Sequence, residues 1–345
     1  MIKTDDYQFE RIPAPLISWY RANKRDLPWR ENHDPYRVWV SEIMLQQTRV
    51  EAVKEYYVRF LTELPTVYDL ANCEESKLLK LWEGMGYYSR ARNLQKTAKL
   101  VCENYDGKFP ETVKELLKLP GIGEYTAGAI SSIAHYKRTP AIDGNVFRVI
   151  SRLTENPTDI SEPKYRAYLT EKLLEIYPEE GVGCSDFTQS LMELGALICK
   201  PQSPDCGLCP LSKICRSFAH KTQENFPILP QKKEKKVEKL CVFILETPNG
   251  LAVRKRENGV LKGMNEFPSF PKKSFKACLE ELGLYEFSII RYRKFKHIFT
   301  HIVWEMDVYY VKSGYVDLPC YTLSELENKI SLPTAFKQCL AILKE

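Results

Sequence analysis

Four cysteines lie within one short stretch of the chain. Cys199, Cys206, Cys209 and Cys215 follow the order C-x6-C-x2-C-x5-C. Thiolates gathered in this way bind a zinc ion or an iron–sulfur cluster. Structural zinc usually takes two separated ligand pairs, and a disulfide framework is not expected in a long chain without a sign of secretion. The spacing therefore favours an iron–sulfur cluster, with zinc as the alternative.

Two carboxyl groups stand in settings that suit acid–base chemistry. Glu42 lies between Val40 and Ile43 in a helical pattern, and a carboxyl group in an apolar pocket has a raised pKa. Asp143 precedes a helical run and is followed by glycine. Two carboxyl groups in different environments can divide the acid and anion roles of glycosidic cleavage. A surface glutamate and a plain N-cap are the alternatives, and the sequence alone does not place the two residues together.

A glycine turn between two helical patterns forms a further signal. The stretch LPGIGEYTAGAI contains Gly121 and Gly123, which follow a proline and precede a helix. Unobstructed amides at a helix N-terminus bind anions such as a DNA phosphate. With ETVKELLKL before it and YTAGAISSIAHY after it, the turn predicts a helix–hairpin–helix. Such a hairpin contacts the DNA backbone and not the bases.

The elements that must position these residues are helical in the first part of the chain. Asp34 and Pro35 predict an N-cap and a first helical residue, and they open YRVWVSEIMLQQ. Helical periodicity recurs in RVEAVKEYYVRFL, SRARNLQKTAKLVCENY and EPKYRAYLTEKLLEIY, and no strand pattern occurs between them. We therefore expect residues 1–220 to form an all-α domain that ends with the cysteine loop.

The pattern changes in the last third of the chain. Residues 221–237 contain prolines and a lysine-rich run and predict a linker. From 238 onward, KLCVFILET, a Pro-Asn-Gly turn and LAVRKR predict a β-hairpin. YRKFKHIFTHIVWEMDVYYV predicts further strands, and SLPTAFKQCLAIL predicts a closing helix. Residues 238–345 are thus expected to form a smaller α+β domain.

Composition limits the classes of protein that remain. The chain has 345 residues, which suits about two domains. Its net charge of +5 leans toward a polyanionic partner. Apolar runs are too short to span a membrane, and the first residues do not form a signal peptide. The other seven of the 11 cysteines are scattered, as expected of free thiols in a reducing cytosol. We expect a cytoplasmic protein, associated with the nucleoid if it is bacterial.

The order of these motifs resembles a known family. WVSEIMLQQTRV, LWEGMGYYSRARNL, LPGIGEYTAGAI, IDGNVFRV and the four cysteines together are similar to the MutY-type adenine DNA glycosylases of the helix–hairpin–helix (endonuclease III) superfamily. The resemblance extends over residues 10–220. It implies removal of adenine mispaired with 8-oxoguanine or guanine in double-stranded DNA, a [4Fe–4S] cluster on the four cysteines, and a monomer.

The resemblance also assigns roles to single residues. Glu42 matches the general acid that protonates adenine and later activates water. Asp143 matches the carboxylate that stabilises the oxocarbenium-like sugar, either as an ion pair or as a covalent intermediate, and Asn145 supports it. Tyr125 replaces the lysine of endonuclease III-like lyases, so the amine needed for a Schiff base is missing. The expected enzyme is therefore a monofunctional glycosylase.

Further positions match DNA-contacting residues of the family. An aromatic side chain, an apolar wall and an amide suit a flipped purine; the matching residues are Trp29, Arg30, Leu45 and Gln189. A second set matches residues that enter the duplex or contact the opposite guanine, namely Gln47, Thr48, Met85 and Tyr87. Lys200, Lys213 and Arg216, near the cysteines, are expected to contact the DNA backbone.

The last domain resembles the MutT-like (Nudix) domain of the same family. A Nudix hydrolase needs the run Arg-Glu-x-x-Glu-Glu-x-Gly, whereas KACLEELG has Lys276 and Ala277 at its first two positions. Loss of a metal carboxylate predicts recognition without nucleotide hydrolysis. Phe299, Thr300 and His301 match a Phe-Ser-His loop that senses 8-oxoguanine, with threonine replacing serine. Asn265 stands where tryptophan is commoner.

Two other functions remain compatible with the motifs. A thymine or uracil mismatch glycosylase of the same superfamily can carry tyrosine at the position of Tyr125, but such enzymes usually end soon after the cysteines. A non-catalytic iron–sulfur DNA-binding protein would not need Glu42 and Asp143. Excision kinetics distinguish all three.

Overall fold

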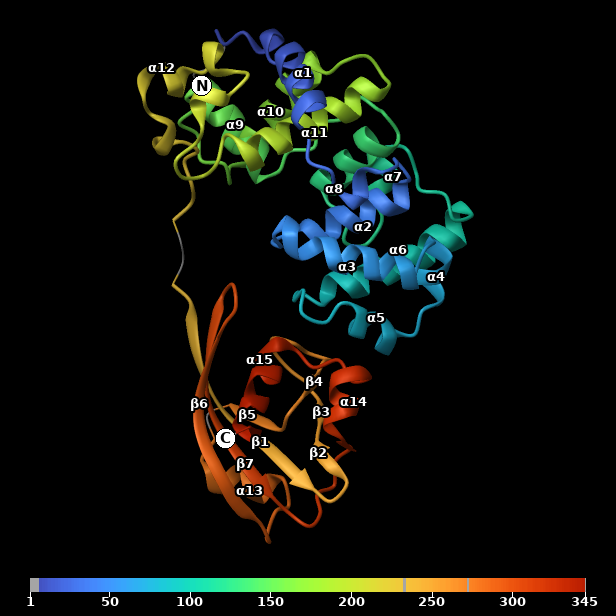
Figure 1. The fold of residues 1–345 in the computed structure, drawn as a ribbon, viewed down its shortest axis with the longest axis vertical. Helices are drawn as coiled ribbons and strands as arrows, with labels where there is room; N and C mark the ends of the chain where they lie inside the picture. Colours follow the sequence, from blue (N-terminus) through green and yellow to red (C-terminus); the bar gives the residue numbers. More distant parts are fainter. Residues whose placement is uncertain (1–5, 232–233, 272, 345) are drawn as a thin grey trace. The chain divides into compact units, whose positions relative to one another are not determined.

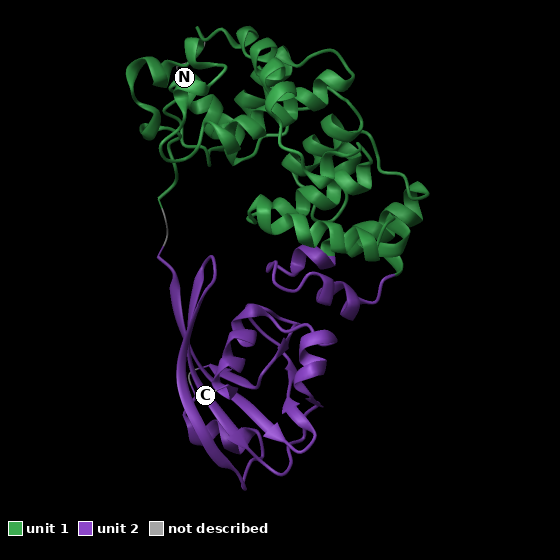
Figure 2. Cartoon of the chain, in the orientation of Figure 1, with its two compact units in different colours: residues 1–72, 93–231 green, residues 73–92, 232–345 purple. Residues whose placement is uncertain are grey.

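The computed structural model describes residues 6–231, 234–271 and 273–344. These residues form two compact units that alternate along the chain (Figure 1, Figure 2). Unit 1 contains the residues up to 72 and residues 93–231, and unit 2 contains residues 73–92 and the chain that follows 231. The predicted linker at 221–237 includes positions 232 and 233, which lie outside the described residues.

Unit 1 is helical. Its α-helices are α1 (Pro13–Asn23), α2 (Pro35–Leu45), α3 (Val50–Glu63), α4 (Val67–Asn72), most of α6 (Ser89–Tyr105), α7 (Val113–Leu116), α8 (Glu124–Ala129), α9 (Gly144–Thr154), α10 (Pro163–Ile176), α11 (Val182–Leu197) and α12 (Arg216–His220). Short helices add η1 (Phe9–Arg11), η2 (Pro28–Arg30), η3 (Ile130–Ala134), η4 (Cys206–Leu208), η5 (Ser212–Ile214) and η6 (Gln223–Asn225). An isolated bridge joins Asp159 to Ile228.

Local sequence explains where the central helix of unit 1 begins. The Asp34 carboxylate accepts a hydrogen bond from the backbone N–H of Arg37, and Pro35 occupies the first turn, which confirms the predicted start of α2. The helix is buried from Val38 to Met44. Helix α11 packs against α1, α9 and η3, so the chain's N-terminal helix lies beside a helix that occurs more than 150 residues later.

The helix after the glycine turn differs from the prediction. The pattern predicted one helix through Tyr136, but the α-helix α8 ends at Ala129 and the chain continues as the π-helix η3. A Cβ on Gly128 would lie 2.3 Å from the carbonyl oxygen of Pro140. This close approach brings the segment before Asp143 against α8. π-Helical turns occur frequently at the functional sites of proteins.

Unit 2 is built on a mixed sheet of order β6-β7-β1-β2-β8, with β5 also paired to β1. Its strands are β1 (Lys236–Thr247), β2 (Gly250–Ala252), β5 (Ser269–Pro271), β6 (Ser288–Ile298), β7 (Ile302–Lys312) and β8 (Cys320–Tyr321), and a separate two-stranded sheet joins β3 (Arg254–Lys255) to β4 (Asn265–Glu266). The predicted β1–β2 hairpin is confirmed, because Thr247 pairs with Gly250. The parallel pairing of β1 with β7, from Lys236↔Ile302 to Glu246↔Lys312, was not predicted.

Helices cover both faces of this sheet. One face packs Trp304, Met306 and Val308 against α14 (Leu323–Asn328), α15 (Thr334–Lys337) and η7 (Gln338–Leu343). The other packs Phe243 and Leu245 against α13 (Phe275–Glu281). Residues 334–343 confirm the predicted closing helix as a short α-helix that continues in the tighter 3₁₀ form.

Residues 73–92 belong to unit 2 although unit 1 surrounds them in sequence. They contain α5 (Glu75–Leu81) and the first turn of α6. The hydroxyl of Ser331 donates to the carbonyl oxygen of Leu79 at 3.1 Å, and Lys337 lies 3.1 Å from the Glu83 carboxylate. Unit 2 therefore combines a predicted α+β domain with a helical segment from the first part of the chain. Across the described ranges, no helix is long and apolar enough to cross a membrane.

Candidate active site

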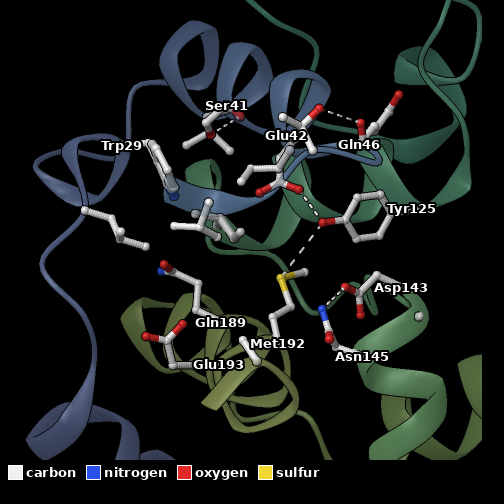
Figure 3. Close-up of a pocket in the computed structure, with 18 of the residues that line it drawn as sticks. Trp29, Ser41, Glu42, Gln46, Tyr125, Asp143, Asn145, Gln189, Met192 and Glu193 are labelled. Atoms are coloured by element: carbon white, nitrogen blue, oxygen red, sulfur yellow. Dashed lines mark hydrogen bonds between the residues drawn. The ribbon is translucent and has the colours of Figure 1, made fainter. Parts of the chain in front are cut away.

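A cavity of about 550 Å³ lies within unit 1. Its walls come from η2, α2, α8, the segment before α9, and α11 (Figure 3). Nine of the residues singled out in the sequence line it: Trp29, Arg30, Glu42, Leu45, Gln47, Thr48, Tyr125, Asp143 and Asn145; Gln189 is a tenth. The fold thus brings together segments that are separated by more than 150 positions in the sequence.

Glu42 is the buried carboxyl group at the centre of this site. Its residue is 6 % exposed, and the phenol of Tyr125 donates a hydrogen bond to its Oε2. Burial raises the pKa of Glu42, the hydrogen bond from Tyr125 opposes the rise, and the nearby Asp143 adds to it; the resulting pKa is about 7. A carboxyl group with this pKa is substantially protonated at neutral pH, which is the state that a general acid requires.

Asp143 both caps a helix and lines the cavity. It is the N-cap of α9, because Oδ1 accepts from the backbone N–H of Val146 at 2.8 Å. Its other oxygen accepts from Nδ2 of Asn145 at 2.7 Å (Figure 3). Burial raises the pKa of Asp143, whereas these two hydrogen bonds lower it. The cap therefore orients a carboxylate that also lines the cavity.

Tyr125 lines the cavity beside Glu42. It is carried by α8, and its hydroxyl contacts Glu42 Oε2 and, at 4.0 Å, the sulfur of Met192. Burial and the neighbouring carboxyl groups raise the pKa of Tyr125 well above its usual value, so the phenol stays protonated and donates a hydrogen bond to Glu42. A neutral phenol cannot form a Schiff base.

The wall opposite the carboxyl groups is partly aromatic and partly polar. Trp29 is 9 % exposed and packs edge-on against Tyr57. Arg30 donates from Nε to the Oε1 atom of Gln189 at 3.1 Å. Figure 3 shows the Gln189 amide directed into the cavity below Trp29. An indole and an amide in the wall of one cavity suit a planar base.

Several residues that line the cavity were not predicted. Arg25, Gln46, Met192 and Glu193 also line the cavity. Glu193 is 1 % exposed and binds two arginines that precede it by 163 and 168 positions. An acidic residue in the apolar helical pattern SLMELGAL was the one available signal. Its partners could not be identified, because long-range pairing leaves no local pattern.

The glycine turn lies outside this cavity. Gly121 has φ +78°, and a Cβ there would lie 2.8 Å from the Cβ of Asn93, so both backbone conformation and space favour glycine. Gly123 is the N-cap of α8. The turn is therefore connected to the active site through α8, which carries Tyr125. Its contact with a DNA phosphate stays a prediction.

The four cysteines line a second, smaller cavity of unit 1, next to α9 and α11. Nη1 of Arg152 donates to Cys199 Sγ at 3.5 Å, and Nε2 of Gln223 donates to Cys206 Sγ at 3.6 Å. Hydrogen bonds to sulfur are typical of iron–sulfur centres. Within the described ranges, no three Cys, His, Asp or Glu side chains are close enough to hold one metal ion. Four thiols around one cavity, two of which accept N–H hydrogen bonds at sulfur, fit an iron–sulfur cluster.

A further cavity, of about 640 Å³, lies within unit 2. Tyr87, Phe299, Thr300 and His301 line it, and the hydroxyl groups of Tyr87 and Thr300 are hydrogen-bonded. Phe299 packs edge-on against Trp304, with ring centroids 4.7 Å apart. The structure thus brings the predicted loop next to the segment that carries Tyr87. Met85 is not among the lining residues and is 7 % exposed.

Lys276 and Ala277, which depart from the Nudix run, and Asn265, which replaces the commoner tryptophan, all lie in unit 2. Lys276 and Ala277 are in the first turn of α13, whose N-cap Ser274 accepts from the N–H of Ala277. Asn265 donates from Nδ2 to the carbonyl oxygen of Ser331 at 2.8 Å. The asparagine side chain therefore connects β4 to the segment before α15 through an amide hydrogen bond, which a tryptophan side chain lacks the amide to make.

Comparison with known proteins matches the first part of the chain and its last third to separate families. Residues 40–175 match the family model of the HhH-GPD superfamily base excision DNA repair proteins, and residues 241–341 match the NUDIX domain. Residues 199–215 match the iron–sulfur binding domain of endonuclease III. The cysteines therefore form an iron–sulfur cluster motif, as their spacing and the resemblance predicted.

Solved structures of DNA glycosylases and of endonuclease III are among those that resemble the chain. A thermostable thymine-DNA glycosylase superposes with a TM-score of 0.55 at 30 % identity and covers 61 % of this chain and 97 % of its own. A non-covalent endonuclease III–DNA complex gives a TM-score of 0.52 at 25 % identity, covering 63 % and 99 %. Both leave more than a third of this chain unmatched.

Curated relatives match more of the chain. The adenine DNA glycosylase of Arabidopsis thaliana is 36 % identical and covers 85 % of this chain, which spans only 56 % of that relative. The adenine DNA glycosylase of Buchnera aphidicola subsp. Schizaphis graminum is 34 % identical, and the match covers 86 % of both chains. The mouse adenine DNA glycosylase is 34 % identical and is covered to 69 %. On these matches, the chain belongs to the family of adenine DNA glycosylases.

Proposed function

We propose that this chain is a monofunctional glycosylase that removes adenine paired with 8-oxoguanine or guanine in double-stranded DNA. The observation that carries the proposal is a protonatable, buried Glu42 in the same cavity as the capped carboxylate of Asp143. Such an asymmetric pair separates the acid role from the anion role. Family membership supports adenine as the base, and DNA as the partner.

The two carboxyl groups act in sequence. Glu42 transfers its proton to a ring nitrogen of the flipped adenine, which becomes a neutral leaving group as the C–N bond to the sugar breaks. Asp143 stabilises the positive charge that develops on the sugar, as an ion pair or a covalent intermediate. Glu42, now a carboxylate, takes a proton from water, and the resulting hydroxide bonds to the sugar carbon. The phenol of Tyr125 stabilises the carboxylate of Glu42 between these steps.

The cavity wall holds the base during this reaction. Trp29 and Leu45 contact its faces, and Arg30 and Gln189 face its polar edge. Gln47 and Thr48, which follow α2, enter the space that the flipped nucleotide leaves. The backbone N–H groups of the turn that contains Gly121 and Gly123 bind a phosphate of the DNA backbone. The iron–sulfur cluster would supply a structural clamp held by Cys199, Cys206, Cys209 and Cys215; nothing in the excision step draws on it.

Unit 2 reads the base opposite adenine. Phe299 offers an aromatic face, and Thr300 and His301 offer polar groups, in a cavity that Tyr87 also lines. Arg92 and Lys235 on the same wall suit a phosphate backbone. Met85, which is buried, supports this segment and does not itself line the cavity. Ala277 removes one metal carboxylate, so unit 2 does not hydrolyse nucleotides.

Base release from a matched series of duplexes tests the proposal. Adenine is placed opposite 8-oxoguanine, guanine and thymine in turn, and a fourth duplex carries thymine opposite guanine. We expect fast release of adenine opposite 8-oxoguanine, slower release opposite guanine, and no strand cleavage without added base. Preferential release of thymine would instead support the alternative of a thymine mismatch glycosylase, since the chain also resembles a solved thymine-DNA glycosylase. Equal rates of adenine release from all three duplexes would contradict recognition of the opposite base by unit 2. Sedimentation of the protein–DNA complex measures whether one copy of the chain binds each duplex, as expected for a monomer.

A further inference from the structure

Glu193 holds two arginines at the polar wall of the active-site cavity. Its Oε1 accepts from Nε of Arg25 at 2.9 Å and its Oε2 from Nη2 of Arg25 at 2.7 Å. The same two oxygens accept from Nη1 and Nη2 of Arg30, at 3.1 and 2.9 Å. The backbone N–H of Arg25 donates to Oε1 as well, at 2.9 Å. One carboxylate thus binds two guanidinium groups in forked geometry.

This carboxylate stays ionised across the working range of pH. Burial acts to raise the pKa of Glu193, but the hydrogen bonds from Arg25 and Arg30 outweigh burial and lower it to about 2. The bond to Glu193 also raises the pKa of Arg25. The two hydrogen bonds to the Glu193 carboxylate therefore hold the guanidinium of Arg30 in one orientation. A further bond from its Nη1 to the carbonyl oxygen of Arg25, at 2.9 Å, adds to this restraint.

The fixed guanidinium determines which way the neighbouring amide faces. Nε of Arg30 points at Oε1 of Gln189, 3.1 Å away. A guanidinium can only donate, so the amide nitrogen of Gln189 cannot take that place. The amide nitrogen instead donates to the hydroxyl of Ser185 at 3.1 Å. That hydroxyl can either donate or accept and would tolerate both orientations. Arg30 alone therefore sets the direction of the amide.

An amide in this direction offers the cavity one free acceptor position on Oε1 and one free hydrogen on Nε2. Adenine presents an amino group beside a ring nitrogen acceptor on both of its polar edges, which matches that pair. A purine with an oxygen at the same carbon, such as guanine or hypoxanthine, presents an acceptor where the amide needs a donor. The mismatch leaves a buried polar atom unpaired.

We propose that Glu193 is a positioning residue that selects a 6-aminopurine over a 6-oxopurine, by holding Arg30 so that Gln189 presents its oxygen to the base. This inference rests on the proposed function, because it takes adenine as the base in the cavity. It concerns base choice within unit 1 and is separate from the reading of the opposite base in unit 2.

The test compares excision of adenine and of hypoxanthine, each opposite 8-oxoguanine, in single-turnover reactions. The measured quantity is the ratio of the two rates, so a general loss of activity cancels. We expect Glu193→Gln to lower the adenine-to-hypoxanthine ratio about tenfold or more, the worth of one bidentate contact. Appearance of hypoxanthine release that the unaltered protein lacks has the same meaning. An unchanged ratio would overturn the inference, as would a native protein without preference between these bases.

Two further variants separate positioning from folding. Glu193→Asp keeps the charge but shortens the side chain, so it is the variant to measure if Glu193→Gln does not fold; its ratio should fall by a smaller factor. Asp186→Asn is the matched control on the same helix: Asp186 pairs with Arg21 at 2.7 Å, and neither residue lines the cavity. Its ratio should equal that of the native protein. If the native protein releases no adenine at all, the proposed function fails, whatever the variants do.

Discussion

The cavities of the two units differ in the kind of groups that line them. Three carboxyl groups line the cavity of unit 1: Glu42 and Glu193 are buried and Asp143 is half-buried, and each accepts a defined hydrogen bond. Among the described residues that line the cavity of unit 2 there is no carboxyl group; aromatic, hydroxyl, imidazole and cationic side chains surround it. Buried carboxyl groups with separated pKa values suit proton transfer, whereas the second set suits recognition. The difference predicts that rate and selectivity can be changed independently.

The largest expected effect removes the acid from unit 1. Glu42→Gln keeps the shape of the side chain but cannot supply the proton, so single-turnover excision should fall by about 10²–10⁴ while the duplex still binds. Gel-shift titration and a base-release assay measure the two quantities. Glu51→Gln, which changes an exposed glutamate paired with Lys54, serves as the control. Full excision by Glu42→Gln would remove the acid role from this residue.

The pH dependence of excision sharpens the same assignment. The protonated form of Glu42 is the active one, and its pKa is about 7. The rate should therefore be level below about pH 7 and fall about tenfold per pH unit above it. Tyr125→Phe removes a hydrogen bond that lowers this pKa, so the decline should move to higher pH. A decline that moves to lower pH, or none in the unaltered protein, would contradict the assignment.

A change in unit 2 should alter selectivity and leave the chemistry intact. Phe299→Ala removes the aromatic face that packs on His297 and Trp304, so the preference for 8-oxoguanine over guanine opposite adenine should fall about tenfold, the usual worth of one stacked base. Rates on both duplexes, measured in parallel, give the preference. The rate opposite guanine should change little. An equal loss on both duplexes would show that the two units are not separable in this way.

The smallest expected effect on opposite-base preference comes from substitutions that separate the hydroxyl of Thr300 from its methyl group. Thr300→Val removes the hydroxyl that is bonded to Tyr87 and keeps the shape, and one hydrogen bond is worth about 1 kcal/mol, or about fivefold in preference. Thr300→Ser keeps the hydroxyl and restores the commoner residue, so its preference should match or exceed the native value. The two variants are compared with the duplexes used for Phe299. Identical behaviour of valine and serine would exclude the hydroxyl as the reading group.

Local signals in the sequence predicted those parts of the molecule that depend on neighbouring residues. Asp34 and Pro35 predicted the start of α2, and the Asn-Gly turn predicted the hairpin of β1 and β2. Features that depend on distant residues were missed. The parallel pairing of β1 with β7 and the π-helix η3 arise from tertiary packing, and Glu193 acquires its role only from arginines far away in sequence. The resemblance supplied the positions of Glu42 and Asp143, whereas the structure supplied the hydrogen bonds that differentiate their environments.

The composition of unit 2 has a practical consequence for deletion experiments. A chain shortened after residue 231 would keep residues 73–92 but lose the part of unit 2 in which they are buried. Lys80 would lose the carbonyl oxygens of Leu326 and Ile330, and Glu83 would lose Lys337. Slower excision by such a fragment would have two causes that the measurement does not separate: loss of the cavity of unit 2, and exposure to solvent of the apolar side chains of residues 73–92. Point substitutions, and not truncation, are therefore the appropriate way to separate the roles proposed for the two cavities.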